Sequence, residues 1–166
     1  MEITDMALKL TRRTVMALMG TLPFVKPAAA EGAVVEVHMY NKDPENPKLR
    51  NVFSPRIVKI KPGDTVKFLS TDKGHNSVTT KGMMPEGAEA WKTRISKDGE
   101  VVFDKPGIYG YHCAPHYALG MVGLVIVEGE GMAANLEEAK AAKKRGKAKK
   151  IWKEIWAEVE EKSLLG

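Results

Sequence analysis

The sequence predicts a mainly β protein of the sandwich or barrel type with a helical C-terminus. Short runs of β-branched and apolar residues recur between residues 34 and 127, and turns rich in Pro and Gly separate them. Such runs are typical of two-layered β domains. Beyond residue 130 the apolar residues recur with a helical period. The 166 residues are enough for one domain with a real core.

The first half of the domain alternates between strands and turns. Pro55 interrupts one predicted strand, which favours a position at the edge of a sheet. Lys61-Pro62-Gly63-Asp64 has the composition of a tight turn. The strands predicted here are 34–40, 52–53 with 57–60, 65–70 and 77–80.

In the second half of the domain, residues 81–97 first interrupt the alternation of strands and turns. Within this segment, residues 88–91 predict the start of a short helix. The strands predicted after it are 101–103, 108–112 and 121–127, with a turn at 105–107.

The C-terminal segment predicts two helices. The first begins with Asn135 as N-cap and Glu138 at the capping-box position, and it ends near Gly146. The second has one apolar face, which we expect to dock on the sandwich; its residues are Ile151, Trp152, Ile155, Trp156 and Val159. Basic residues cluster at 143–150, as a solvated helix surface or, alternatively, an interaction patch.

The N-terminus has the pattern of an export signal. Arg12 and Arg13 precede an apolar run, and Ala28-Ala29-Ala30 is a cleavage motif. The arginine pair resembles a twin-arginine signal, and an ordinary secretory signal is the alternative. We therefore expect three parts: a signal peptide at 1–30, a β domain at 31–130 and a helical extension at 131–166.

Charge and composition exclude several classes of function. The whole chain has a net charge of +5, and removal of residues 1–30 leaves 22 basic and 19 acidic residues, or +3. This mild excess suits acidic protein partners better than nucleic acid. No apolar run is long enough to span a membrane. The single cysteine cannot form a disulfide within the chain.

One short loop contains three candidate metal ligands. Cys113, His116 and Met121 follow each other in the spacing C-x2-H-x4-M between two predicted strands, and His75 follows a strand upstream. Two histidines, a cysteine and a weak axial methionine are the ligands of a blue-copper electron-transfer site. Zinc also accepts cysteine and histidine, but the methionine argues against it. No ligand position is left open for a substrate water, which argues against catalysis.

The chain resembles the pseudoazurin family of blue-copper proteins, within the cupredoxin superfamily. The resemblance covers nearly all of the chain after the signal, including the paired helices, which plastocyanins lack. The matching segments are 36–39, 61–66, 72–76, 84–89 and 113–121. It implies an eight-stranded Greek-key cupredoxin sandwich with two C-terminal α-helices.

The resemblance also implies residue roles. The copper ligands are His75, Cys113, His116 and Met121. Asn76 lies next to the ligands, with its backbone N–H toward the Cys113 sulfur. Pro115 lacks an N–H and stiffens the loop. Ala114 departs from the Thr common in the family, so we expect the side chain of Asn76 to lack one partner.

The implied function is single-electron transfer in the periplasm by a monomer that is not an enzyme. The implied acceptor is a copper nitrite reductase of denitrification, with a cytochrome-type donor. The partner would meet the His116 edge through an apolar patch with a basic rim; the expected residues are Met84, Pro85, Pro115, Leu119, Lys42, Lys73, Lys81 and Lys92. The alternative is copper storage or delivery to another protein.

Overall fold

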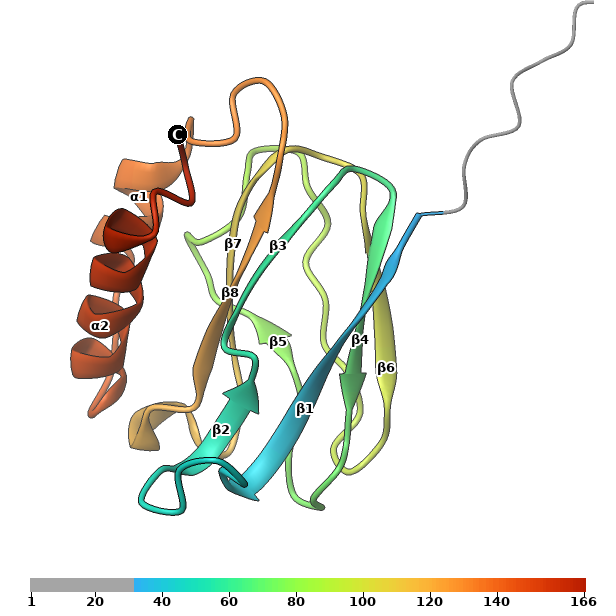
Figure 1. Ribbon diagram of the computed structural model, residues 1–166, viewed down its shortest axis with the longest axis vertical. Coiled ribbons are helices and arrows are strands. Elements are labelled where there is room, and N and C mark those ends of the chain that lie inside the picture. The colour runs from blue at the N-terminus through green and yellow to red at the C-terminus, as the bar shows by residue number, and fades with distance from the viewer. Residues whose placement is uncertain (1–31) are drawn as a thin grey trace, which may run out of the picture.

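The computed structural model describes residues 32–166, whose strands form two sheets packed face to face (Figure 1). The first sheet has the order β2-β1-β4-β6 and the second the order β3-β8-β7-β5. The first contains β1 (Val34–Lys42), β2 (Arg50–Ser54), β4 (Asp64–Leu69) and β6 (Gly99–Phe103). The second contains β3 (Ile57–Ile60), β5 (Val78–Thr79), β7 (Gly107–His112) and β8 (Val122–Val127). The predicted eight-stranded sandwich is confirmed, whereas the predicted signal at 1–30 lies outside the described residues.

The interrupted strand around Pro55 becomes two edge strands in different sheets. β2 pairs antiparallel with β1, and β3 pairs parallel with β8. The chain therefore crosses from one sheet to the other at Pro55, where a residue without an N–H interrupts no ladder.

The sandwich has two apolar layers. One fills the space between the sheets and includes Met39, Phe68 and Tyr111. The other lies between the second sheet and the helices and includes Leu124 and Trp152. All residues of β8 are buried because this strand contributes to both layers, which explains its continuous apolar sequence.

The two helices cover the outer face of the second sheet (Figure 1). They are α1 (Leu136–Ala141) and α2 (Ala148–Glu161). In α2 the predicted apolar face is buried at Trp152, Ile155 and Val159. The described part of the chain contains no helix with the length and apolar character that a membrane span needs.

The prediction for the first helix is wrong in two respects. The helix ends at Ala141 rather than near Gly146. Asn135 does precede it, but its side chain makes no cap hydrogen bond. Instead, Asn135 Oδ1 accepts the N–H of Ile108 at 3.1 Å, and Nδ2 donates to the Ile108 carbonyl at 2.8 Å. A tertiary contact with β7 thus replaces the expected local cap.

The helix predicted at residues 88–91 is also absent. This segment runs extended beside β5, where the N–H of Thr79 donates to the Trp91 carbonyl and the N–H of Thr93 donates to Ser77. The Trp91 ring packs against Phe68, with ring centres 6.2 Å apart. Strand-like pairing and core packing therefore override the local helix preference of the segment.

Candidate metal centre

The loop between β7 and β8 is closed by its own backbone. The N–H of Cys113 donates to the Met121 carbonyl at 3.0 Å, just beyond the last β7–β8 pair. The N–H of His116 donates to Cys113, and that of Met121 donates to His116. A short 3-10 helix, Tyr117–Leu119, fills the loop. These bonds hold three of the predicted ligand residues in one rigid turn.

Gly120 allows this turn to close. Its φ of +98° lies in the left-handed region, which favours glycine. A Cβ atom at this position would lie 2.9 Å from the Ile151 side chain of α2. The loop therefore rests directly on the helical layer.

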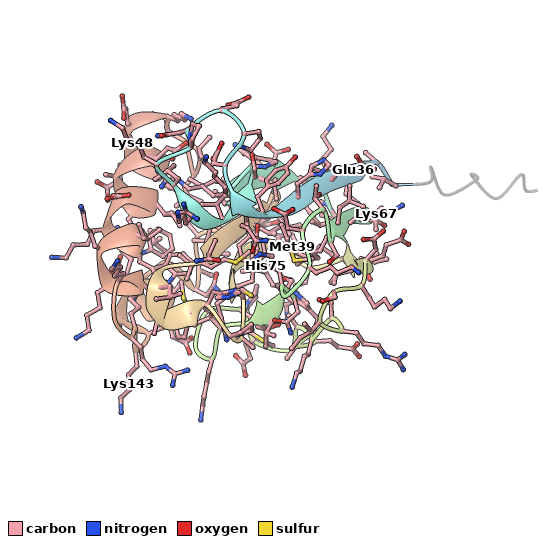
Figure 2. All side chains as sticks on the ribbon, turned by 90° about the horizontal axis from the view of Figure 1, so that it is seen from below. Glu36, Met39, Lys48, Lys67, His75 and Lys143 are labelled. Carbon is pink, nitrogen blue, oxygen red and sulfur yellow. The ribbon has the colours of Figure 1, made fainter. Side chains whose placement is uncertain are left out.

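His75 reaches the same place from the segment that follows β4. Its Nδ1 lies 3.7 Å from Cys113 Sγ, and His116 Nδ1 lies 3.5 Å from the same sulfur. The two Nδ1 atoms are 3.0 Å apart. His75 and Cys113 are fully buried, and His116 is half-buried. Figure 2 views the molecule from below and places His75 near the middle of this end.

These spacings fit donors that surround one metal ion. With metal–nitrogen bonds of about 2.0–2.1 Å and a metal–sulfur bond of about 2.3 Å, a trigonal arrangement spaces nitrogen and sulfur by about 3.7 Å. The observed nitrogen–sulfur distances are 3.7 and 3.5 Å. Imidazole suits copper in proteins, and thiolate suits copper(I). Met121 is fully buried in the same core cluster as Cys113, so a thioether is available near the three donors.

Asn41 orients His75, a role that no pattern in the sequence indicates. Asn41 Oδ1 lies 2.9 Å from His75 Nε2. An amide oxygen can only accept, so Nε2 carries the proton and Nδ1 presents its lone pair to Cys113 and His116. The carboxylate of Asp72 accepts the Asn41 N–H at 2.7 Å and fixes the strand end that carries this amide.

Burial favours the uncharged forms of Cys113 and His75, the two fully buried donors. It raises the pKa of the Cys113 thiol, against the opposing effect of the backbone N–H groups of Asn76 and His116. Burial, with a smaller contribution from His116, lowers the pKa of His75, while Asp72 raises it. A thiolate at this position therefore needs a cation beside it, and a neutral His75 is ready to bind one.

Both polar atoms of the Asn76 side chain have a backbone partner, although one N–H of the amide is not used in either bond. Its Oδ1 accepts the backbone N–H of Ala114 at 3.0 Å, and its Nδ2 donates to the Thr93 carbonyl at 3.1 Å. The Asn76 side chain is thus held by backbone groups, whichever side chain follows Cys113. Thr93 also accepts the Ser77 N–H through its own hydroxyl at 2.8 Å, so both sides of the histidine-bearing segment are held.

The predicted apolar patch is only partly present. Pro115 and Leu119 are exposed beside His116, and 51% of the Leu119 surface is accessible. Met84 and Pro85 do not join them. Pro85 is buried against Gly107, at the opposite end of β7 from Cys113, and Met84 packs on the core between the sheets. The cause is the path of residues 80–85, which follow β7 away from the loop as far as Gly107.

The four predicted lysines are all exposed; they are Lys42, Lys73, Lys81 and Lys92. Lys42 and Lys73 adjoin Asn41 and Asp72, which hydrogen bond to each other. Lys92 lies opposite Val78, whose other neighbour is His112. Within residues 32–166 none of the four forms an ion pair.

Comparisons with known proteins agree with this geometry. Residues 42–128 match the model of the family described as copper binding proteins, plastocyanin/azurin family. A pseudoazurin of Methylorubrum extorquens is 45% identical over 134 residues, which cover 81% of this chain and 86% of the relative. A pseudoazurin of Paracoccus pantotrophus is 43% identical over 117 residues, covering 70% and 77%. The solved native pseudoazurin of Hyphomicrobium denitrificans superposes with a TM-score of 0.69 at 41% identity, covering 76% of this chain and 98% of that one.

Proposed function

Because the chain belongs to the plastocyanin/azurin family of copper-binding proteins, and is a blue-copper electron carrier rather than an enzyme, we propose that it shuttles single electrons as a periplasmic monomer. We propose His75, Cys113, His116 and Met121 as the copper ligands. The observation that carries this assignment is the convergence of His75 Nδ1 and His116 Nδ1 on Cys113 Sγ, at 3.7 and 3.5 Å.

The protein's contribution is a rigid set of donors. Copper, when bound, supplies the change between Cu(I) and Cu(II). The Cys113–Met121 hydrogen bond holds the loop closed. Asn41 keeps His75 in one tautomer, and Asn76 fixes the backbone at Ala114. Donors held in this way need little rearrangement when the charge of the ion changes, which favours rapid electron transfer.

The partner meets the protein at the His116 edge. His116 is half-buried, and the exposed Pro115, Ala118 and Leu119 surround it with apolar surface. The exposed lysines Lys42, Lys73, Lys81 and Lys92 form the rim. We propose copper nitrite reductase as the acceptor and a cytochrome as the donor, with the rim attracting acidic surfaces and raising the association rate.

A visible spectrum tests the copper assignment. The protein with Cu(II) should be intensely blue or green, should lose its colour with ascorbate and should regain it with ferricyanide. Cys113→Ser should abolish the colour, whereas His38→Gln, a histidine outside the cluster, should leave it intact. Bound copper without this colour would contradict thiolate ligation and would favour copper storage or delivery.

Stopped-flow kinetics test the acceptor. The reduced protein should lose its electron to copper nitrite reductase at a rate that falls as salt is added. Lys73→Glu should slow this reaction at low ionic strength, whereas Lys61→Glu, at the opposite end of the sandwich, should have a smaller effect. Equal effects of the two substitutions would overturn the proposed rim.

A further inference from the structure

A basic pocket lies beside the ligand loop, on the side of the helices. It has a volume of about 600 Å³ and opens between residues 80–82, the end of β7 and the α1–α2 connection. Its charged lining consists of Lys81, Lys143 and Arg145 with a single acidic residue, Glu138. Tyr117, Ala141 and Ala142 provide apolar surface in the lining. The pocket therefore combines a cationic rim with a partly apolar wall.

A stack of side chains positions Arg145 at this pocket. The Arg145 guanidinium lies 5.2 Å from the centre of the Tyr117 ring, as in a cation–π contact. The Tyr117 ring stacks on His112 with a centre-to-centre distance of 4.4 Å. The Tyr117 hydroxyl donates to the Lys143 carbonyl at 3.2 Å. The Arg145 side chain is thus positioned by Tyr117, and the backbone of the α1–α2 connection is fixed at Lys143.

The pocket adjoins the ligand loop, because the connection that lines it is bonded to that loop. The N–H of Lys147 donates to the Ala118 carbonyl at 2.8 Å, which joins the α1–α2 connection to the ligand loop. Gly146 packs against the same carbonyl, so closely that a Cβ atom would overlap it. A protein that covers Ala118 and Leu119 would therefore also meet the rim of the pocket.

The cations of the rim are not neutralised by neighbouring acids. Within residues 32–166 no ion pair involves Lys81, Lys143 or Arg145, and all three are exposed. In Figure 2 the Lys143 side chain points away from the body of the molecule. Lys144 differs, because its ammonium donates to the carbonyls of Ala139, Lys140 and Ala142 at the end of α1. In the basic cluster at 143–150, Lys144 therefore has a structural role, whereas Lys143 and Arg145 are exposed.

We propose that this pocket docks acidic side chains on the surface of the redox partner. The inference rests on the proposed function, because it extends the partner surface from the His116 edge to the α1–α2 connection. A carboxylate in the pocket would face Lys81, Lys143 and Arg145 against the single Glu138. Contacts at both places would fix the orientation of the partner as well as attract it. The competing assignment is a solvated helix surface without a binding role.

The first test maps where an anion binds. The probe is hexacyanochromate(III), a paramagnetic trianion, added to the ¹⁵N-labelled Cu(I) protein at low ionic strength. Amide signals of residues 80–82 and 143–145 should broaden selectively. The double variant Lys143→Glu with Arg145→Glu should lose this broadening. The matched control is Lys61→Glu with Lys153→Glu, which should keep it. This control makes the same charge change at two exposed lysines elsewhere that form no ion pair within the described part of the chain.

The second test measures the partner. With copper nitrite reductase as acceptor, the Lys143/Arg145 variant should lower the second-order rate constant about 10-fold at low salt, and the control variant less than 3-fold. Unselective broadening, or equal rate losses in the two variants, would overturn the inference. The mapping can be repeated on the metal-free chain, so failure of the copper assignment or of this acceptor is distinguishable from failure of the pocket.

Discussion

The side-chain oxygen of Asn41 lies 2.9 Å from Nε2 of His75, and the two residues are separated by 34 positions in the sequence. The bond connects the end of β1 to the segment after β4. It selects the tautomer of a proposed copper ligand through a residue that touches no metal. Such outer hydrogen bonds commonly change metal affinity by about 10- to 100-fold.

Asn41→Ala should therefore weaken copper binding by about 10-fold, because His75 then populates both tautomers and can rotate. Competition with a copper chelator measures the effect. Asn46→Ala, in the exposed loop after β1, is the matched control and should bind copper as the unchanged protein does. Equal affinities of the two variants would show that Asn41 has no orienting role.

Asn76→Ala should destabilise the metal-free chain by about 2 kcal/mol, because the Ala114 N–H and the Thr93 carbonyl lose their partner. Urea unfolding of the metal-free protein measures the free energy of unfolding.

Ala114→Thr tests the hydrogen bonding around Asn76 in a second way. Since both polar atoms of the Asn76 side chain already have backbone partners and Ala114 is exposed, this variant should stay within about 0.5 kcal/mol of the unchanged protein. A large gain in stability from the threonine would contradict the hydrogen bonding described for Asn76.

Gly146→Ala should lower the free energy of unfolding by about 1–3 kcal/mol. The residue has a φ of +52°, and a Cβ atom would overlap the Ala118 carbonyl. Gly131→Ala is the control, since Gly131 also has a positive φ, of +75°, but no atom of residues 32–166 lies where a Cβ would meet it. The difference between the two variants measures how tightly the α1–α2 connection is seated on the ligand loop. Equal losses would mean that this seating contributes little.

Glu158 should make the stability depend on pH. Its hydrogen bond to Lys162, together with Arg56, lowers the pKa of this carboxyl. A lowered pKa in the folded state means that the stabilisation is present above the ordinary pKa of about 4.5 and is lost as the pH falls through the folded value. Glu158→Gln should therefore cost about 0.5–1 kcal/mol at pH 7 and less near pH 3, since the pair is partly exposed.

Thermal or urea unfolding at the two pH values measures this difference. Glu161→Gln, on the same helix and exposed, is the control for the change in net charge. A cost for Glu158→Gln that does not vary between the two pH values would mean that the carboxylate charge is not what binds Arg56 and Lys162.

The sequence was informative where the structure is local. The Cys113–Met121 loop is a short connection between adjacent strands, so its spacing alone predicts which side chains meet. His75 was recognisable because it follows an alternating strand. Asn41 was not, because its contact depends on how β1 and β4 lie side by side in the sheet.

The segment between β5 and β6 was misread for the same physical reason. Its local sequence favours a helix at 88–91 and suggested an exposed patch at Met84 and Pro85. Tertiary contacts decide otherwise, because Gly107 and Gly110 leave room on β7 for Pro85 and Met83. Gly107 follows Pro85 by 22 residues and Gly110 follows Met83 by 27, so no local pattern connects each glycine to its partner.

The β7–β8 hairpin is buried on both of its faces, and this affects which parts of the molecule can unfold locally. Both strands contribute side chains to the layer between the sheets and to the layer under the helices. Their amide hydrogens should therefore exchange with solvent only when the whole domain unfolds, whereas those of the short α1 exchange through local opening. Cys113, His116 and Met121 lie in the loop that connects these two slowly exchanging strands. Partial unfolding of the helical layer would consequently leave the donors assembled, and escape of a bound ion would be tied to the lifetime of the native state.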